Sequence, residues 1–256
     1  MDFPLSRDTA PRLELVAHTG STNADLRTYA DDPDGWPHLS TLVTRNQTAG
    51  RGRLDRTWVA PAGAALAVSV LLRDLPLDPA PRGWIPLLSG LAMAEAVTAQ
   101  LPGHDVAVKW PNDVLVDGRK ICGILAEATP DAVIVGAGVN TAMTAEQLPV
   151  PTATSFAASG VEVDEDRLLA AYLTALGRRL SDLVGAGDAV ASGLHDAVTA
   201  RCATLGQAVR VALPGDRVVE GIATALDAEG RLLVVSEGAE RAISAGDVVH
   251  VRRAEG

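Results

Sequence analysis

Lysine is rare in this chain and is confined to one short stretch. Of the 22 lysine and arginine residues, only Lys109 and Lys120 are lysine. A compact ammonium on a flexible stem can follow a single phosphate or carboxylate oxygen, whereas a planar guanidinium binds two oxygens in a fixed fork. We therefore predict that Lys109 and Lys120 mark a site for an anionic substrate. Two surface lysines on a hairpin are the alternative interpretation.

A loop rich in arginine and glycine is the second feature that could do chemistry. Segment 50–58 contains Gly50, Arg51, Gly52, Arg53, Arg56 and Trp58. The glycines let backbone approach a ligand closely, and the guanidinium groups bind phosphate or carboxylate oxygens. An indole offers a flat surface for stacking a purine. A solvated basic turn and an RNA-contacting patch are the alternatives, and the net charge of −10 argues against the second.

Two further segments are ambiguous by themselves. Ser21-Thr22-Asn23 precedes a helix-forming run and is typical of an N-cap, although the same residues could contact a ligand. Segment 136–140, which ends at Asn140, is either a strand-to-loop turn or a weak dinucleotide motif. Phosphate-loop, GxSxG and HExxH motifs are absent, and Cys122 and Cys202 are too far apart for a cysteine zinc site. We expect no protein-held metal site.

The elements that must position these residues form an α/β pattern. Apolar runs predict strands over 38–45, 64–72, 106–110, 113–116, 121–128 and 132–139, the last of them broken by Gly136 and Gly138. Helices are predicted after Asn23 and over 85–101, 166–184 and 189–203. The segment from Asn46 to Thr57 is predicted to be a polar loop.

The pattern of residues along the sequence changes after Leu205-Gly206. Short valine-rich runs alternate with turn residues from Val209 to Val251, which indicates four or five strands of a small β-barrel. We predict two domains, residues 1–203 and residues 204–256. The N-terminus lacks the basic and apolar blocks of a signal peptide, and no apolar run reaches the roughly 18 residues of a membrane span. A cytoplasmic protein that does not bind membranes is expected.

Taken together, the motifs resemble those of the biotin–protein ligase family. The resemblance rests on Ser21-Thr22-Asn23, Gln47, the GRGRxxRxW loop from Gly50 to Trp58, KWPND from Lys109 to Asp113, the segment from Arg119 to Glu127, and Gly136-x-Gly138-x-Asn140. It implies a mixed-sheet, class II synthetase-like catalytic domain followed by an SH3-like β-barrel. It also implies that biotin and ATP are joined to biotinyl-5′-AMP, and that biotin then passes to one lysine of a biotin carboxyl carrier domain.

The resemblance assigns roles to individual residues. Lys120, Arg51 and Arg53 are implied to be catalytic. The biotin site is implied to contain Ser21, Thr22, Asn23, Gln47, Arg51, Gly52, Arg53 and Lys120. The ATP side is implied to contain Arg56, Trp58, Lys109, Asn112, Asp113 and Asn140. Mg²⁺ is expected to arrive with ATP and to carry the departing pyrophosphate.

The remaining expectations concern partners and rival functions. About 20 residues precede Ser21, so we expect no DNA-binding domain and no DNA as partner. A monomer or a weak homodimer is expected. Lipoate and octanoate transferases share the implied fold but typically lack the GRGRxxRxW loop. A protein that holds biotinyl-AMP without turnover is a rival of a different class, and an ATP–pyrophosphate exchange assay separates it from a ligase.

Overall fold

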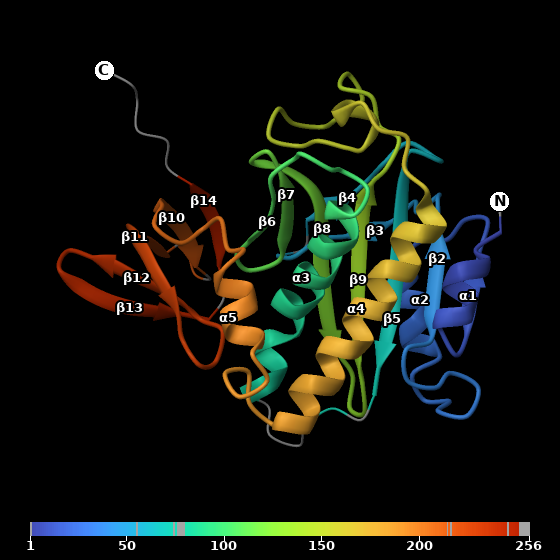
Figure 1. Ribbon diagram of the computed structural model, residues 1–256, viewed down its shortest axis with the longest axis horizontal. Helices are drawn as coiled ribbons and strands as arrows, with labels where there is room; N and C mark the ends of the chain where they lie inside the picture. Colours follow the sequence, from blue (N-terminus) through green and yellow to red (C-terminus); the bar gives the residue numbers. More distant parts are fainter. Residues whose placement is uncertain are drawn as a thin grey trace.

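The structure is a computed structural model, and it describes residues 2–54, 56–73, 75, 80–213, 215, 217–244 and 246–250. A seven-stranded sheet forms the centre of the molecule, and a five-stranded sheet lies beside it (Figure 1). Helices α3 (Ile85–Thr98) and α4 (Glu165–Ala186) cover one face of the central sheet. The two layers and the neighbouring small sheet confirm the expected α/β architecture.

The central sheet is mixed, as expected. Its strands, in spatial order, are β1 (Leu13–Leu15), β2 (Thr41–Thr44), β5 (Ala65–Leu72), β9 (Val133–Asn140), β8 (Arg119–Ala128), β7 (Asp113–Val116) and β6 (Val106–Lys109). β1 and β2 are parallel, and the other neighbours are antiparallel. The four strands from β6 to β9 are consecutive in sequence and pair in that order, as successive hairpins do.

Alternation along β5 and β9 divides the sheet into two faces. Leu66, Val68 and Val70 of β5 belong to the large core under α3 and α4, together with Val135 and Val139 of β9. Because side chains alternate along a strand, Ala67, Ser69, Gly136 and Gly138 face the opposite side. That side therefore carries small side chains, where a ligand can approach the sheet.

Helix α2 (Thr22–Thr28) lies on this second face. Leu26 of α2 packs with Leu42, Leu71 and Ile134 in a smaller apolar cluster. Ser21 caps the helix by accepting a hydrogen bond from Ala24 N at 3.4 Å, which confirms the predicted N-cap. Thr22 and Asn23 belong to the first turn of the helix, which therefore begins earlier than predicted.

Capping residues fix the ends of the helices on the first face. Asp164 caps α4 by accepting from Arg167 N at 3.1 Å, and Gly187 ends it with φ 68°. The first helix, α1 (Pro4–Thr9), has its free N–H groups bound by α4, since Leu5 N and Ser6 N both donate to the Asp166 carboxylate at 2.9 Å. Helix α5 (Leu194–Thr199) is shorter than the predicted 189–203.

The C-terminal sheet has five antiparallel strands. They are β10 (Ala208–Leu213), β11 (Arg217–Leu226), β12 (Leu232–Ser236), β13 (Ala239–Ile243) and β14 (Asp247–His250), in the spatial order β13-β12-β11-β10-β14. Among the residues that the structure describes, β13 and β14 lie at opposite ends of this order, so the predicted closed barrel is not confirmed. Val251, the predicted end of this region, lies outside the described residues.

The two sheets are joined by hydrogen bonds along the β6 edge. Val108 N donates to Arg201 O at 2.8 Å, and Ala203 N donates back to Val108 O at 2.9 Å. Trp110 N donates to Thr204 Oγ1 at 3.0 Å, and its indole N–H donates to Gly230 O at 2.9 Å. Trp110 is 2% exposed, so it anchors the C-terminal sheet to the end of β6.

Three further secondary-structure expectations are wrong in detail. The strand predicted over 38–45 is limited to Thr41–Thr44. The polar loop contains a short hairpin, β3 (Gly50–Arg51) paired with β4 (Thr57–Trp58). Strand β9 is not broken at its glycines but runs through them, because extended backbone accepts glycine and the missing side chains create space.

Candidate active site

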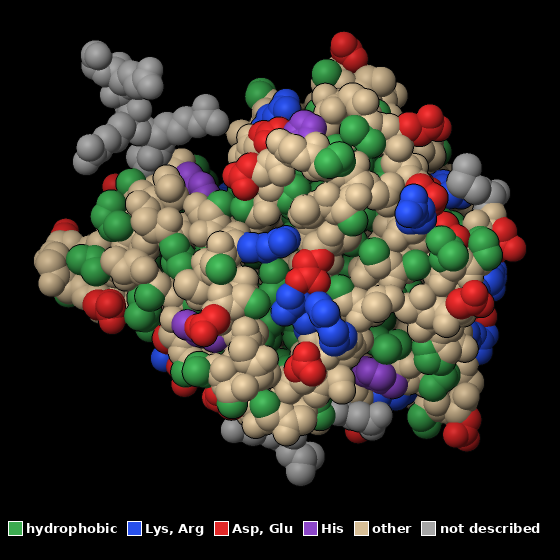
Figure 2. Space-filling view, viewed as in Figure 1, with side chains coloured by type: hydrophobic (Ala, Val, Ile, Leu, Met, Phe, Trp, Pro, Cys, Tyr) green, Lys and Arg blue, Asp and Glu red, His purple; other side chains and the backbone are tan. Residues whose placement is uncertain are grey.

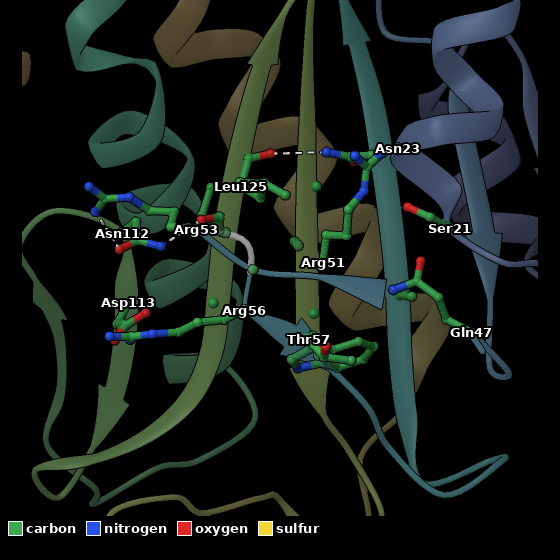
Figure 3. Close-up of a pocket in the computed structure, with 18 of the residues that line it drawn as sticks. Ser21, Asn23, Gln47, Arg51, Arg53, Arg56, Thr57, Asn112, Asp113 and Leu125 are labelled. Carbon is green, nitrogen blue, oxygen red and sulfur yellow. Dashed lines mark hydrogen bonds between the residues drawn. The ribbon is translucent and has the colours of Figure 1, made fainter. Parts of the chain in front are cut away.

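One pocket brings most of the predicted site residues together (Figure 3). It opens on the face of the sheet opposite α3 and α4. Twelve of the fourteen predicted residues line it: Ser21, Thr22, Asn23, Gln47, Arg51, Gly52, Arg53, Arg56, Trp58, Asn112, Asp113 and Lys120. Lys109 and Asn140 are not among its lining residues. Segments far apart in the sequence thus converge on one cavity, which the motifs alone did not require.

The β3–β4 hairpin covers the pocket and carries its arginines. Gly52 N donates to Arg56 O at 2.6 Å, which closes the turn. Arg53 reaches across to the residue before β7 and donates from Nη1 to Asn112 Oδ1 at 3.1 Å (Figure 3). Burial lowers the pKa of Arg53, but an arginine keeps its charge at neutral pH. The hairpin therefore presents fixed cations to the cavity.

Lys120 lies opposite the hairpin at the start of β8. Its Nζ pairs with Asp113 Oδ1 at 2.6 Å, and Asp113 belongs to the neighbouring strand β7. Gly123 makes room for this pair, since a Cβ there would lie 2.9 Å from Lys120 Nζ. The lysine side chain is 42% exposed, so its ammonium is paired and still open to a ligand.

Two glycines of β9 form the floor of the pocket. A Cβ on Gly136 would lie 2.4 Å from Asn23 Oδ1, and one on Gly138 would lie 2.8 Å from Cε2 of the Trp58 indole. Both distances are far below an ordinary van der Waals contact. The Gly136-x-Gly138 pattern is therefore neither a turn nor a dinucleotide motif, because it lets Asn23 and Trp58 lie against the sheet.

The C-terminal sheet also contributes to the pocket, which the sequence did not indicate. Gly246 and Asp247 line it, and Arg56 Nη2 bonds to Asp247 Oδ2. Burial acts to raise the pKa of Asp247, but the bond from Arg56 and the charges of Arg56, Lys109 and Arg53 outweigh it and lower that pKa. Lys109 thus lies near the Asp247 carboxylate, at the point where Arg56 contacts β14. It does not line the pocket.

Asn140 has a structural environment of its own. It lies at the end of β9, is 8% exposed, and donates from Nδ2 to Thr154 O at 2.8 Å. This bond holds segment 150–156 against the sheet beside Lys120, whose backbone N–H donates to Thr152 O at 2.7 Å. The predicted role of Asn140 toward ATP remains a prediction.

Charge elsewhere on the molecule is mixed. On the helix-covered face, Lys and Arg side chains lie among Asp and Glu side chains (Figure 2). Arg178 and Arg179, for example, both pair with Glu95. Within the described part of the chain, no group of three or more His, Cys, Asp or Glu could hold a metal ion. None of the helices described is both long and apolar enough to cross a membrane.

Cys122 lies directly behind the pocket and is predicted to be inert. It is 1% exposed, and burial raises its pKa to about 12. Because the thiolate is the reactive form, iodoacetamide at pH 7.5 should leave native Cys122 unmodified, and burial likewise raises the pKa of Cys202. Mass spectrometry should find no label on the native chain and two labels after denaturation in guanidinium. Rapid labelling of Cys122 in the native protein would contradict its buried position on β8.

Comparisons with known proteins show which family the chain resembles. Residues 18–140 match the Biotin/lipoate A/B protein ligase family, and residues 204–251 match the Biotin protein ligase C terminal domain. The biotin–[acetyl-CoA-carboxylase] ligase of Mycobacterium tuberculosis is 40% identical over 247 residues, which cover 94% of this chain and 90% of the relative. The chain belongs to the biotin protein ligase family.

Other members of the biotin protein ligase family are also similar to this chain in sequence and fold. The biotin–[acetyl-CoA-carboxylase] ligase of Paracoccus denitrificans is 32% identical, covering 91% of this chain and 98% of the relative. The fold matches the Aquifex aeolicus ligase in complex with biotin and ATP, with TM-score 0.76, 24% identity and coverage of 95% and 100%. The Leishmania major ligase in complex with biotinyl-5-AMP matches with TM-score 0.60, 27% identity and coverage of 95% and 99%.

Proposed function

We propose that this protein is a biotin–protein ligase that activates biotin with ATP and transfers it to a carboxylase. The product of the first step is biotinyl-5′-AMP, with release of pyrophosphate. The observation that carries the proposal is the single pocket in which Lys120, Arg51 and Arg53 meet the polar residues at the start of α2. A cavity lined by both cations and amides suits an acid joined to a nucleotide.

The first step brings a carboxylate onto a phosphate, so the barrier is largely charge repulsion and positioning. Lys120 and the hairpin arginines neutralise that charge from opposite sides of the pocket. Lys120 is held by Asp113, and Arg53 is held by Asn112, so both cations are oriented before substrates arrive. No enzyme nucleophile is needed, because the biotin carboxylate attacks the α-phosphorus directly and pyrophosphate leaves.

The second step needs protection from water. An acyl phosphate anhydride hydrolyses readily, and a covering hairpin excludes water until the acceptor amine arrives. The β3–β4 hairpin is suited to this role because it lies at the pocket, where Arg53 bonds to Asn112 and Arg56 bonds to Asp247. The acceptor lysine then attacks the biotinyl carbonyl and releases AMP.

Mg²⁺ would bind with ATP rather than in a cage of protein ligands. This ion is typically held by one or two carboxylates together with substrate phosphates. Asp113 and Asp247 are two carboxylates that line the pocket, and both offer oxygen ligands, so the residues fit such an ion. When bound, Mg²⁺ would neutralise charge on the leaving pyrophosphate.

The finer assignments belong to the same proposal. Residues 1–203 would be a class II synthetase-like catalytic domain, and residues 204–256 an SH3-like domain. The five short strands and the irregularity of β11 at Ala223/Ala225 support a strongly bent sheet of that kind. The carboxylase would present a biotin carboxyl carrier domain, and the ligase would act in the cytoplasm as a monomer or weak homodimer.

Exchange of labelled pyrophosphate into ATP tests the proposed function. We expect exchange that depends on biotin and Mg²⁺ and is absent with octanoate or lipoate as the acid. Exchange with the fatty acids alone would place the protein with the lipoate and octanoate enzymes. A folded protein that binds biotin but gives no exchange with any acid would be a binding protein instead.

A further inference from the structure

A chain of hydrogen-bonded polar side chains lies buried between α2 and the central sheet, and Ser69 is at its centre. Ser69 belongs to β5, is 0% exposed, and does not line the pocket. Its hydroxyl donates to Asn23 Oδ1 at 2.6 Å, and its oxygen lies 2.7 Å from Thr22 Oγ1. One hydroxyl therefore contacts two consecutive residues of the first turn of α2.

The rest of this network fixes the orientation of the Asn23 amide. Asn23 Nδ2 donates to Glu127 Oε2 at 2.8 Å. It also donates to Leu125 O at 3.3 Å (Figure 3). Both partners can only accept, so the nitrogen must face β8 and the oxygen must face Ser69. Each polar atom of the Asn23 side chain is thus bonded within the protein, which makes Asn23 a brace between α2 and the sheet.

The same network extends through Thr22 to Gln47 at the pocket wall. Gln47 Oε1 accepts from Thr22 N at 2.9 Å and lies 3.1 Å from Thr22 Oγ1, whose one hydrogen points to the nearer Ser69 oxygen when Ser69 donates to Asn23. A backbone N–H can only donate, so the amide oxygen of Gln47 must face α2. Its NH₂ group consequently points toward Gly50 and the cavity, where a Cβ on Gly50 would lie 2.4 Å from Nε2.

We propose that Ser69 is a positioning residue for the acyl substrate, because it holds Asn23 and Thr22 and thereby turns the Gln47 NH₂ group into the pocket. This inference rests on the proposed function for the identity of the acid. The NH₂ donor of Gln47 is suited to a neutral carbonyl of that acid, at the end of the pocket away from Lys120.

The packing around Ser69 supports a role in positioning Asn23. Ser69 pairs in register with Gly136 of β9, and a Cβ on Gly136 would collide with Asn23 Oδ1 at 2.4 Å. The Asn23 amide therefore lies beside two small residues on neighbouring strands, Ser69 and Gly136. An alanine at position 69 would fill the same space but would leave Asn23 Oδ1 buried without a donor.

The test compares Ser69→Ala with Ser89→Ala in the pyrophosphate exchange assay. Ser89 is an equally buried serine on α3, bonded to the Tyr172 hydroxyl at 2.8 Å, on the opposite face of the sheet. Both variants remove a buried hydroxyl: Ser89→Ala loses the contact with Tyr172, and Ser69→Ala loses the contacts with Asn23 and Thr22. We expect Ser69→Ala to raise KM for biotin on the order of ten-fold, with KM for ATP and kcat within about two-fold of wild type. Ser89→Ala should change none of the three.

A double variant and a direct measurement complete the test. If Ser69 acts through Asn23, then Ser69→Ala with Asn23→Ala should raise KM for biotin no further than Asn23→Ala alone. Side-chain NH₂ signals of Asn23 and Gln47, assigned by nuclear magnetic resonance, should lose protection from hydrogen exchange in Ser69→Ala. If the wild-type protein catalyses pyrophosphate exchange and Ser69→Ala leaves KM for biotin unchanged, the inference about Ser69 is wrong. The proposed function would still stand. Absence of pyrophosphate exchange in the wild-type protein would overturn the proposed function. The side-chain amide signals would still show whether Ser69 orients Asn23 and Gln47.

Discussion

Replacing Lys120 with alanine should lower the rate of biotin-dependent pyrophosphate exchange by about 10²- to 10³-fold, the loss typical of removing one preorganised charge from an active site. Lys120 lies opposite the arginine hairpin, where it can offset the charge that builds up as carboxylate meets phosphate. The protein should fold, because Lys120 is 42% exposed and its pairing with Asp113 contributes little to stability. Arg53→Ala should act in the same direction.

Controls separate charge from position in this experiment. Lys120→Arg should restore only part of the rate, since a planar guanidinium cannot follow one oxygen as an ammonium does. Arg119→Ala removes the neighbouring exposed cation on β8 and should leave the rate within about two-fold of wild type. Unchanged exchange in both Lys120→Ala and Arg53→Ala, with thermal unfolding as the check of folding, would remove the proposed mechanism.

Replacing Gly138 with alanine should damage the part of the pocket that we propose binds ATP. The added Cβ would lie 2.8 Å from Cε2 and Cζ2 of Trp58, and a rigid indole can yield only by moving away from the sheet. Overpacking of this kind costs about 1–3 kcal/mol, so we expect KM for ATP to rise by roughly ten- to a hundred-fold. Tryptophan fluorescence should show the displacement of Trp58.

Gly185→Ala is the matched control for Gly138→Ala. Gly185 lies in α4, and a Cβ there would meet nothing within 4 Å. Alanine in a helix is favoured over glycine by about 1 kcal/mol, so this variant should be at least as stable as wild type with normal kinetics. If Gly138→Ala kept the wild-type KM for ATP, the position of Trp58 against β9 would have no part in nucleotide binding.

Much of the fold could be predicted because the strands of the central sheet are long apolar runs. The eight residues of β5, for example, are all buried and read as a buried strand without tertiary information. Helix α1 could not be predicted in the same way, since its N-terminal N–H groups are bound by the Asp166 carboxylate, 160 residues away in sequence. Its stability is a property of the folded core rather than of its own sequence.

The candidate site was predicted through its motifs more than through its geometry. Glycine and arginine stand out in sequence, so the hairpin residues and Lys120 could be named in advance. Ser69 and Asp247 carry no such signal, because an isolated serine in an apolar strand and an aspartate beside a turn are common. The meaning of Gly136 and Gly138 also depended on the structure, since only the packed chain places Asn23 and Trp58 against them.

The placement of the two lysines has a practical consequence for handling the protein. Lys109 and Lys120 are the only lysines of the chain, and both lie at or beside the pocket, while Cys122 and Cys202 are buried. Reagents that couple through side-chain amines would therefore react at the catalytic end of the molecule, and coupling through thiols would require unfolding. Attachment to a bead, a surface or a dye should instead use a cysteine introduced on an exposed position of α4, such as Asp182, on the face away from the pocket.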